Sequence, residues 1–552
     1  MVLAALFALL VSQHADSTAL LRRARLAQTD FEWARKLRLP FAVARTGGGC
    51  DARIGRFCYW HDASARRPPP EPAEIGAARE RLIRMLDSVA DRVPGDEWIA
   101  GQRVRYLLEA GRPADALAAA RHCRATPWWC EALDGLARHV AGDYPGADQA
   151  FRTALAHMPA STRCRWTDLS VLLEGRVGRA YGRLGCDERT RRNPRIWWLA
   201  QPLLSRAGND RRTEHFARRT LAHAWRDAAS PYGLQNGSDQ TELMERYGWP
   251  VGWSQSVSPA GPDAGRTVIG SEREPSYHFL PESLAVPGPT VPGDAPWARE
   301  RYAPAYADAF EFIEPEIAAF RRGDSTVVIA IWDLSQDTLF RGLEREAALV
   351  LARDEMTVPV VTRQAGAAVS GLLVARAPWE PGLVSLEITA PAERRAARGR
   401  LGLRMLRPPG QRVVVSDLLA FDPSDSLPTD LSDVLPAAHS LLDLPRGTRV
   451  GLYWEVYGLA AGGERLATAV RVVPERIGWL RRAAGSLGLA SRPRRAELAW
   501  TESGVPRNGV APRALVLDLS TLPPGDYRIE VTVRAEGAPA AVAARPMRIV
   551  PQ

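Results

Sequence analysis

The chain has 552 residues, of which 46% are hydrophobic and 24% are charged, so it has a globular composition and is too long for one hydrophobic core. Its formal net charge is +9, but Lys36 is its only lysine, and the arginine runs at 189–195 and 394–407 lack interleaved aromatic residues. We therefore predict that these arginines lie on solvated faces and that the protein does not bind nucleic acid.

The first residues, MVLAALFALLV, form an apolar run with the length of the apolar core of a signal peptide. Ser17-Thr18-Ala19 is the best candidate for a cleavage site, although no basic residue precedes the run. We therefore predict a signal peptide over 1–19 and an extracytoplasmic protein, periplasmic or secreted. The alternative is a buried amphipathic first helix. No other apolar run approaches the length of a membrane span, so no transmembrane helix is predicted.

All six cysteines lie before residue 187 and fall into three pairs that are close in sequence. Such a set is typical of disulfides formed in an oxidising compartment, whereas the CxxC-type spacing of a zinc site is absent. For the middle pair, Pro127 would begin a helix and place the second cysteine on the partner helix of a hairpin. We predict no metal, no cofactor and the disulfides Cys50 with Cys58, Cys123 with Cys130, and Cys164 with Cys186. Six unpaired, buried cysteines are the alternative.

Small and aromatic residues recur over 128–160 with the spacing of a helical hairpin. Gly135 and Ala147 would let two helices approach closely, and Phe151 would fill the groove to the next unit. The pattern resembles the tetratricopeptide repeat, and a weaker copy covers 97–127. The resemblance implies that the concave face of the better repeat is lined by Trp129, Ala132, Leu136 and His139. Core packing is the alternative for Trp129 and Leu136.

The segment 193–257 contains an aromatic pair, a polar block and an Asp followed at a fixed distance by Arg-Tyr-Gly and Pro. It resembles the GWxTD domain, a bacterial family of unassigned activity that is often found in exported proteins. The segment departs from the family at the eponymous motif, where this chain has residues 235–239 and retains only the final Asp. The motif residues, as structural or binding positions, are Trp197, Trp198, Asn209, Asp210, Glu214, His215, Asp239, Arg246, Tyr247, Gly248 and Pro250.

One constellation in this segment has catalytic residue types. In a helix from residue 210, Asp210, Glu214 and Arg218 share one face with His215 beside them, and a carboxylate can make a neighbouring histidine a general base. In the alternative, Asn209 or Asp210 caps the helix, Glu214 pairs with Arg218, and His215 packs on an aromatic ring. No nucleophile or metal-ligand set accompanies the group, so we assign no catalytic residue.

The end of this segment has a structural interpretation. Asp239 would accept hydrogen bonds from the backbone that follows it, and Gly248 would adopt a positive φ before Pro250. Arg246 is expected to pair with Asp239 or Glu214 across a partly buried site.

Beyond residue 257 the chain first becomes rich in Pro and Gly and then alternates with a period of two. We predict a connection over 258–323, closed by a short helix at 312–320, and then an antiparallel β-sandwich region. The expected strands are 326–335, 347–353, 382–388, 412–418, 449–457, 467–473, 496–500, 514–519 and 527–533.

The predicted fold class is therefore multidomain α plus β. The expected parts are a signal peptide at 1–19, a helix and disulfide loop at 20–70, tetratricopeptide-like repeats at 71–192, a mostly helical GWxTD-like domain at 193–257, the connection at 258–323, a β-sandwich at 324–425, and a second sandwich or continuation of the first at 426–552.

This organisation favours a nonenzymatic, extracytoplasmic protein-interaction or envelope-assembly protein, with protein partners and envelope association without a transmembrane helix. Two alternatives remain. One is a cryptic hydrolase centred on residues 210–250, and the other is a binder of an anionic surface polymer through an arginine-rich face.

Overall fold

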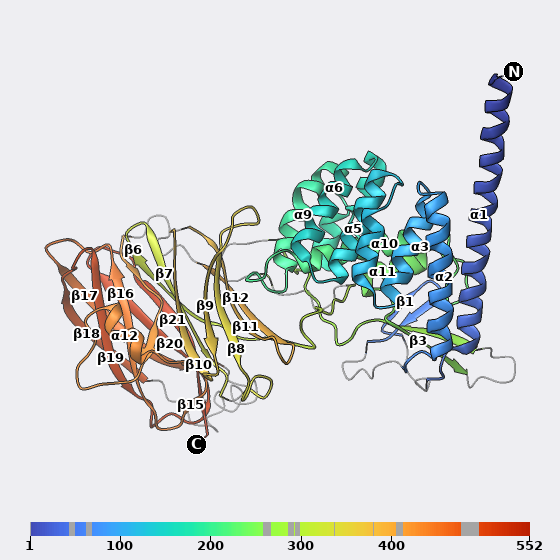
Figure 1. Ribbon diagram of the computed structural model, residues 1–552. Helices are drawn as coiled ribbons and strands as arrows, with labels where there is room; N and C mark the ends of the chain where they lie inside the picture. The colour runs from blue at the N-terminus through green and yellow to red at the C-terminus, as the bar shows by residue number, and fades with distance from the viewer. Residues whose placement is uncertain are drawn as a thin grey trace. The chain divides into compact units, whose positions relative to one another are not determined.

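The computed structural model describes residues 2–42, 50–61, 69–257, 266–284, 292, 299–335, 337–378, 380–403, 412–475 and 496–551. The chain is mixed α plus β with a strand-rich C-terminal region, as predicted (Figure 1). It divides into two compact units, Met1–Leu284 with Pro292–Phe310 and Ala285–Val291 with Glu311–Gln552. We call them the helical unit and the β unit. Among the described residues, no helix combines the length and the apolar character that spanning a bilayer requires.

The helical unit contains eleven of the helices that the structure describes and two small β-hairpins. The helices are α1 (Val2–Arg38), α2 (Ala73–Arg92), α3 (Glu97–Glu109), α4 (Pro113–Arg121), α5 (Pro127–Val140), α6 (Tyr144–His157), α7 (Ala160–Trp166), α8 (Gly175–Tyr181), α9 (Cys186–Ala200), α10 (Asp210–Trp225) and α11 (Ser238–Tyr247). The hairpins pair β1 (Ala52–Ile54) with β2 (Phe57–Tyr59), and β3 (Gly252–Val257) with β4 (Arg266–Ser271).

Local sequence signals explain the hairpin of α5 and α6. Pro127 begins α5, and the side chain of Asp143 caps α6 by accepting a hydrogen bond from the backbone N–H of Gly146. A Cβ at Gly135 would lie 2.8 Å from the ring of Phe151, so glycine is required where the two helices approach. These are the contacts that the small residues predicted.

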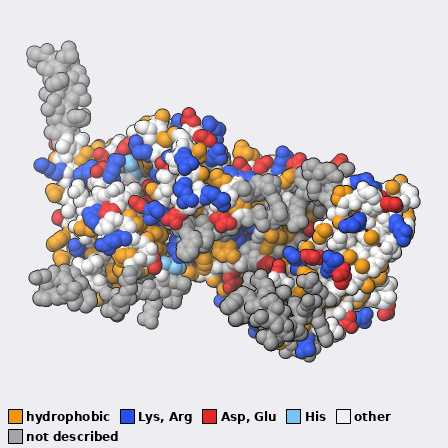
Figure 2. Space-filling model, turned by 180° about the vertical axis from the view of Figure 1, so that it is seen from behind, with side chains coloured by type: hydrophobic (Ala, Val, Ile, Leu, Met, Phe, Trp, Pro, Cys, Tyr) orange, Lys and Arg blue, Asp and Glu red, His pale blue; other side chains and the backbone are white. Residues whose placement is uncertain are grey.

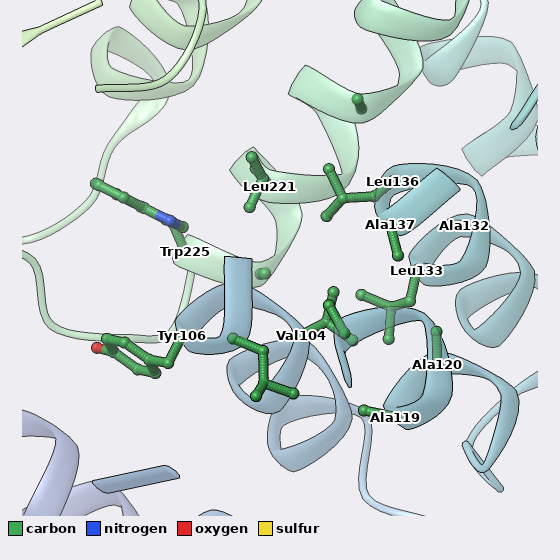
Figure 3. Close-up of a cluster of buried hydrophobic side chains, with 14 of the residues drawn as sticks. Val104, Tyr106, Ala119, Ala120, Ala132, Leu133, Leu136, Ala137, Leu221 and Trp225 are labelled. Carbon is green, nitrogen blue, oxygen red and sulfur yellow. The ribbon is translucent and has the colours of Figure 1, made fainter. Parts of the chain in front are cut away.

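Helix α10 packs into the groove that the hairpins form. It contacts α3, α5 and α6, and Figure 3 shows its Leu221 beside Leu136 of α5 and its Trp225 near Tyr106 of α3. Trp129, Ala132, Leu136 and His139, which were expected to line the concave face of the better repeat, are all buried. Another segment of the same chain fills the groove, and Trp129 and Leu136 pack in the core, which was the alternative for these two residues.

The predicted connection over 258–323 is also structured in part. β4 pairs with β3, and the expected helix at 312–320 is instead β5 (Ala309–Phe312) followed by β6 (Glu316–Arg322). Alternate residues of β6 face two different apolar cores, and this period of two favours a strand.

In its described residues, the β unit contains four sheets and a short helix, α12 (Leu431–Val434). Its remaining strands are β7 (Ser325–Asp333), β8 (Arg345–Ala352), β9 (Val360–Gly366), β10 (Ser370–Pro378), β11 (Gly382–Ala390), β12 (Arg395–Leu403), β13 (Val414–Val415), β14 (Leu419–Phe421), β15 (Leu444–Pro445), β16 (Arg449–Tyr457), β17 (Glu464–Pro474), β18 (Ala496–Gly504), β19 (Val510–Asp518), β20 (Gly525–Ala535) and β21 (Ala541–Val550). The sheet orders are β10-β7-β6, β5-β12-β11-β8-β9, β13-β16-β14 with β19 on β16, and β15-β21-β20-β17-β18.

Three apolar cores join these sheets face to face. On β7, Val328 and Ala330 enter a core with β8 and β11, whereas Val327 and Ile329 enter a second core with β14 and β16. A third core lies between the sheet of β16 and the sheet of β20. Because β7 is covered on both faces, it has a nearly continuous apolar sequence.

Beyond β6, the sequence missed β9, β10, β12, β14, β15 and β21, and in the expected strand 412–418 only β13 is present. The arginine run at 394–407 was expected to be solvated, but Ala396, Ala397 and Arg398 on β12 are buried. Elsewhere the expectation fits better: Figure 2 shows Lys and Arg side chains interspersed with Asp and Glu over the visible face of the helical unit.

Candidate functional site

The structure places each predicted cysteine pair at disulfide distance, with Cα–Cα separations of 5.2, 5.6 and 5.6 Å. Cys50–Cys58 closes the β1–β2 hairpin, Cys123–Cys130 spans the turn between α4 and α5, and Cys164–Cys186 joins α7 to the start of α9. All three pairs lie in the helical unit, and this prediction is confirmed.

Glu214 of α10 is the centre of a buried polar network. Arg218 Nε donates to Glu214 Oε1 at 2.7 Å, and His139 Nε2 lies 2.7 Å from Glu214 Oε2. The other ring nitrogen of His139 lies 2.9 Å from the Thr213 hydroxyl. Burial opposes ionisation of Glu214, but the charge of Arg218 and the hydrogen bond from His139 outweigh it and hold the pKa of this carboxyl below its usual range.

The start of α10 is held by polar side chains. Asn209 caps the helix by accepting a hydrogen bond from the backbone N–H of Arg212 at 2.9 Å, as the structural alternative predicted. The next residue, Asp210, accepts a hydrogen bond from the Tyr302 hydroxyl at 2.9 Å. Burial raises the pKa of Asp210, so this carboxyl is more easily protonated than a solvated one.

Two arginines tie α10 to neighbouring segments. Arg218 donates to the backbone carbonyls of Glu245 and Arg246 at the end of α11, and to the carbonyl of Arg301. Arg219 bridges to the Glu245 carboxylate at 3.0 Å. Arginines that satisfy the last carbonyls of a helix fix its position, so the network orders the motif residues around α10.

His215 does not form a pair with the carboxylate beside it. It is fully buried, its ring centroid lies 5.0 Å from that of Trp197, and Arg219 Nε donates to its Nε2 at 3.1 Å. Burial, followed by the charge of Arg219, lowers its pKa well below the usual value, so the ring is neutral. The histidine that contacts Glu214 is His139, which lies 75 positions away in the sequence.

The aromatic pair at the end of α9 is also buried. Trp197 belongs to an apolar cluster with Ile196 and Leu280, and the guanidinium of Arg195 lies 4.6 Å from the ring centroid of Trp198. These rings therefore pack in the interior and line no open groove.

The backbone around α11 is as predicted, but the charged side chains of this helix form ion pairs other than those predicted. Asp239 accepts two hydrogen bonds from the Arg56 guanidinium, at 2.7 and 2.8 Å, and one from the backbone N–H of Gln240. Arg246 instead pairs with Glu242, four residues earlier on the same helix. The expected pairing of Arg246 with Asp239 or Glu214 is therefore wrong, because side chains from distant segments already occupy both carboxylates.

The last three motif residues shape the exit from α11. Gly248 has φ of 102°, as predicted, and a Cβ there would lie 3.4 Å from Arg218 Nη2. Pro250 packs against Gly270 of β4. Tyr247 stacks on Tyr59 of the β1–β2 hairpin, with ring centroids 3.6 Å apart.

Sequence reasoning missed a second polar cluster beside these tyrosine rings, formed by Glu272, Glu274 and His61. Burial, reinforced by the charge of Glu274, raises the pKa of Glu272 to about 8, so this carboxyl is protonated at neutral pH. His61 Nδ1 lies 3.4 Å from Glu274 Oε1. The short phrase of aromatic and polar residues after Glu274 was the available signal, but the residues that surround it come from distant segments.

Within the described residues, no group of three or more His, Cys, Asp and Glu side chains is placed to hold a metal ion. No family model matches the sequence, and no curated protein matches it. Many solved structures match weakly, and two of them, both with a TM-score of 0.14, illustrate this. The red sea bream transglutaminase is 10% identical, with 44% of this chain and 32% of that chain covered. A tetra-tandem repeat from the extending region of a large adhesion protein is 11% identical, with 43% and 49% covered.

Proposed function

We propose that this chain is a nonenzymatic interaction protein that acts outside the cytoplasm, and that its β unit binds partners by adding a strand to an open sheet edge. The observation that carries the proposal is the edge strand β18. Among the described residues, it pairs only with β17, and most of its side chains are exposed. An edge strand presents unpaired N–H and C=O groups, which a strand from another protein can complete.

The side chains of β18 leave room for such a partner. Leu498 is 52% exposed near the start of the strand. The charged residues are paired within the sheets, since Arg471 donates to Glu497 and Arg513 donates to Glu502. The edge therefore carries little uncompensated charge that would repel an incoming strand.

The network of α10 supports the nonenzymatic part of the proposal. Glu214 is occupied by Arg218 and His139, and His215 is buried and neutral. A general base must reach a substrate proton, directly or through one water molecule. These groups instead join α10 to the segments that cover it, which is a structural role.

Export and family membership belong to the same proposal. We propose that 1–19 is a signal peptide, that 97–160 is tetratricopeptide-like, and that 193–257 is a divergent GWxTD domain. The three disulfides support an oxidising compartment, where such bonds persist.

Affinity capture from an envelope extract of the source organism tests whether a partner binds at the edge strand β18. The bait is the full chain, compared with Leu498→Lys on β18 and with Val542→Lys, a residue of similar exposure (57%) on β21 in the same sheet. We expect a partner that the full chain and Val542→Lys retain and that Leu498→Lys loses. Equal capture by both variants would place the partner elsewhere, and no retained partner would argue against an interaction role.

A further inference from the structure

Helix α1 has two apolar faces on opposite sides. The inner face, which includes Ala24 and Phe31, is buried in the core of the helical unit. On the outer face, Leu26, Trp33 and Leu37 are 58%, 61% and 52% exposed. Their spacing of i, i+7 and i+11 places them within about 40° of one another around a helix of 3.6 residues per turn. We call these three residues the outer stripe.

The surroundings of the outer stripe are basic. The exposed charged residues of α1 are Arg22, Arg23, Arg25 and Arg38 against Asp16 and Asp30. Arg22 and Arg23 form no ion pair within the described part of the chain. Figure 1 shows α1 at the outer edge of the helical unit, beside α2, so the stripe is open to a large partner.

We propose that α1 docks the protein on an anionic lipid surface through the outer stripe and its flanking arginines. A tryptophan and two leucines can enter the boundary between headgroups and acyl chains, while the arginines remain among the headgroups. The stripe begins after residue 19, so removal of a signal peptide would leave it intact.

A second copy of the chain is a poorer occupant of this face. If Leu26 and Trp33 take the a positions of a heptad, the d positions are Thr29 and Lys36. A coiled-coil seam needs apolar residues at both positions, whereas a lipid surface requires only one apolar side. The charge complementarity with anionic headgroups is a second argument for the lipid.

Co-sedimentation of the full chain with vesicles tests the proposal. We expect binding to vesicles of equal parts phosphatidylglycerol and phosphatidylcholine, and much weaker binding to phosphatidylcholine alone. Trp33→Ser with Leu37→Ser should weaken binding roughly tenfold or more, because two exposed apolar anchors are lost. Arg22→Gln with Arg23→Gln should weaken binding to the anionic vesicles about tenfold. Arg183→Gln with Arg191→Gln is the matched control, because Arg183 is exposed in the turn after α8 and Arg191 is exposed on α9, and it should bind normally.

All substituted side chains are exposed, so thermal unfolding should be unchanged in each variant. The proposal is overturned if the full chain does not sediment with anionic vesicles, or if the control pair weakens binding as much as Arg22 and Arg23 do. It is also overturned if the stripe variant converts a dimer to a monomer without changing vesicle binding. The inference rests on the proposed extracytoplasmic role but not on the β18 edge, so Leu498→Lys should bind vesicles normally, and the two ideas fail separately.

Discussion

Ion pairs in which both side chains are fully buried occur in the helical unit, whereas in the described part of the β unit the buried Glu455 pairs with a partly exposed Arg322. In the helical unit, buried ion pairs join distant segments, such as Arg105 with Glu32 at 2.8 Å and Arg211 with Glu300 at 2.6 Å. In the β unit, β7 buries apolar residues on both faces between two other sheets. Apolar contacts tolerate small shifts, whereas a buried charge must keep its partner. The comparison teaches that the helical unit gains specificity at the cost of sensitivity to single polar changes.

Removal of one buried charge should produce the largest difference in stability between the two units. Glu214→Gln leaves Arg218 without a compensating charge, and breaking a buried pair from one side costs roughly 3 to 5 kcal/mol. We expect scanning calorimetry to show a lower unfolding temperature for the helical unit and an unchanged one for the β unit. Asp239→Asn is the control, because its partner Arg56 is 43% exposed, and it should lower the stability less than Glu214→Gln does. Equal shifts from the two variants would show that burial does not set the cost.

Removal of a disulfide should produce a smaller difference in stability between the units. Only the helical unit is affected, because the β unit contains no cysteine. Cys164 and Cys186 are 22 positions apart, and in the chain-entropy picture replacing both by Ser should destabilise the helical unit by about 3 kcal/mol. Cys123 and Cys130, only 7 positions apart, should matter slightly less. Urea unfolding of each pair of variants measures this. The interpretation fails if mass spectrometry finds six free thiols in protein purified without reductant, or if the transition of the β unit moves instead.

A pH dependence confined to the helical unit is also expected. The pKa of Glu272 is raised from 4.5 to about 8 in the folded chain, so the folded state holds a proton that the unfolded state releases. Stability should therefore fall as the pH rises from about 4.5 to about 8. Glu272→Gln should flatten this fall, as measured by urea midpoints across the range. An unchanged slope would mean that the Glu272 carboxyl is solvated.

Acid should also lower the stability of the helical unit, so this second pH effect has the opposite direction. Burial disfavours the charged form of Glu109, but Arg35 and Arg105 dominate and lower its pKa to about 2. The stability contributed by such carboxylates is present above their unfolded pKa and is lost as the pH falls toward the folded value.

Local spacing predicted much of this molecule. The cap at Asn209, the turn at Gly248 and the three cysteine pairs all depend on residues close in sequence. The pairings of His139 with Glu214 and Arg56 with Asp239 could not be predicted, because 75 and 183 positions separate the partners. Strand β12 was missed for another reason. Its arginines mimic a solvated run, although Arg398 is buried beside the ring of Phe312.

The closure of α1 by late residues has a consequence for synthesis. The Gln255 side chain donates to the carbonyl of Leu39, 216 positions earlier, and Gln28 donates to the carbonyl of Ala229. At translation rates of roughly 5 to 20 residues per second, Gln255 is synthesised on the order of ten to forty seconds after Leu39. Until then the polar contacts that hold α1 are incomplete, and the nascent chain exposes apolar surface that chaperones can bind.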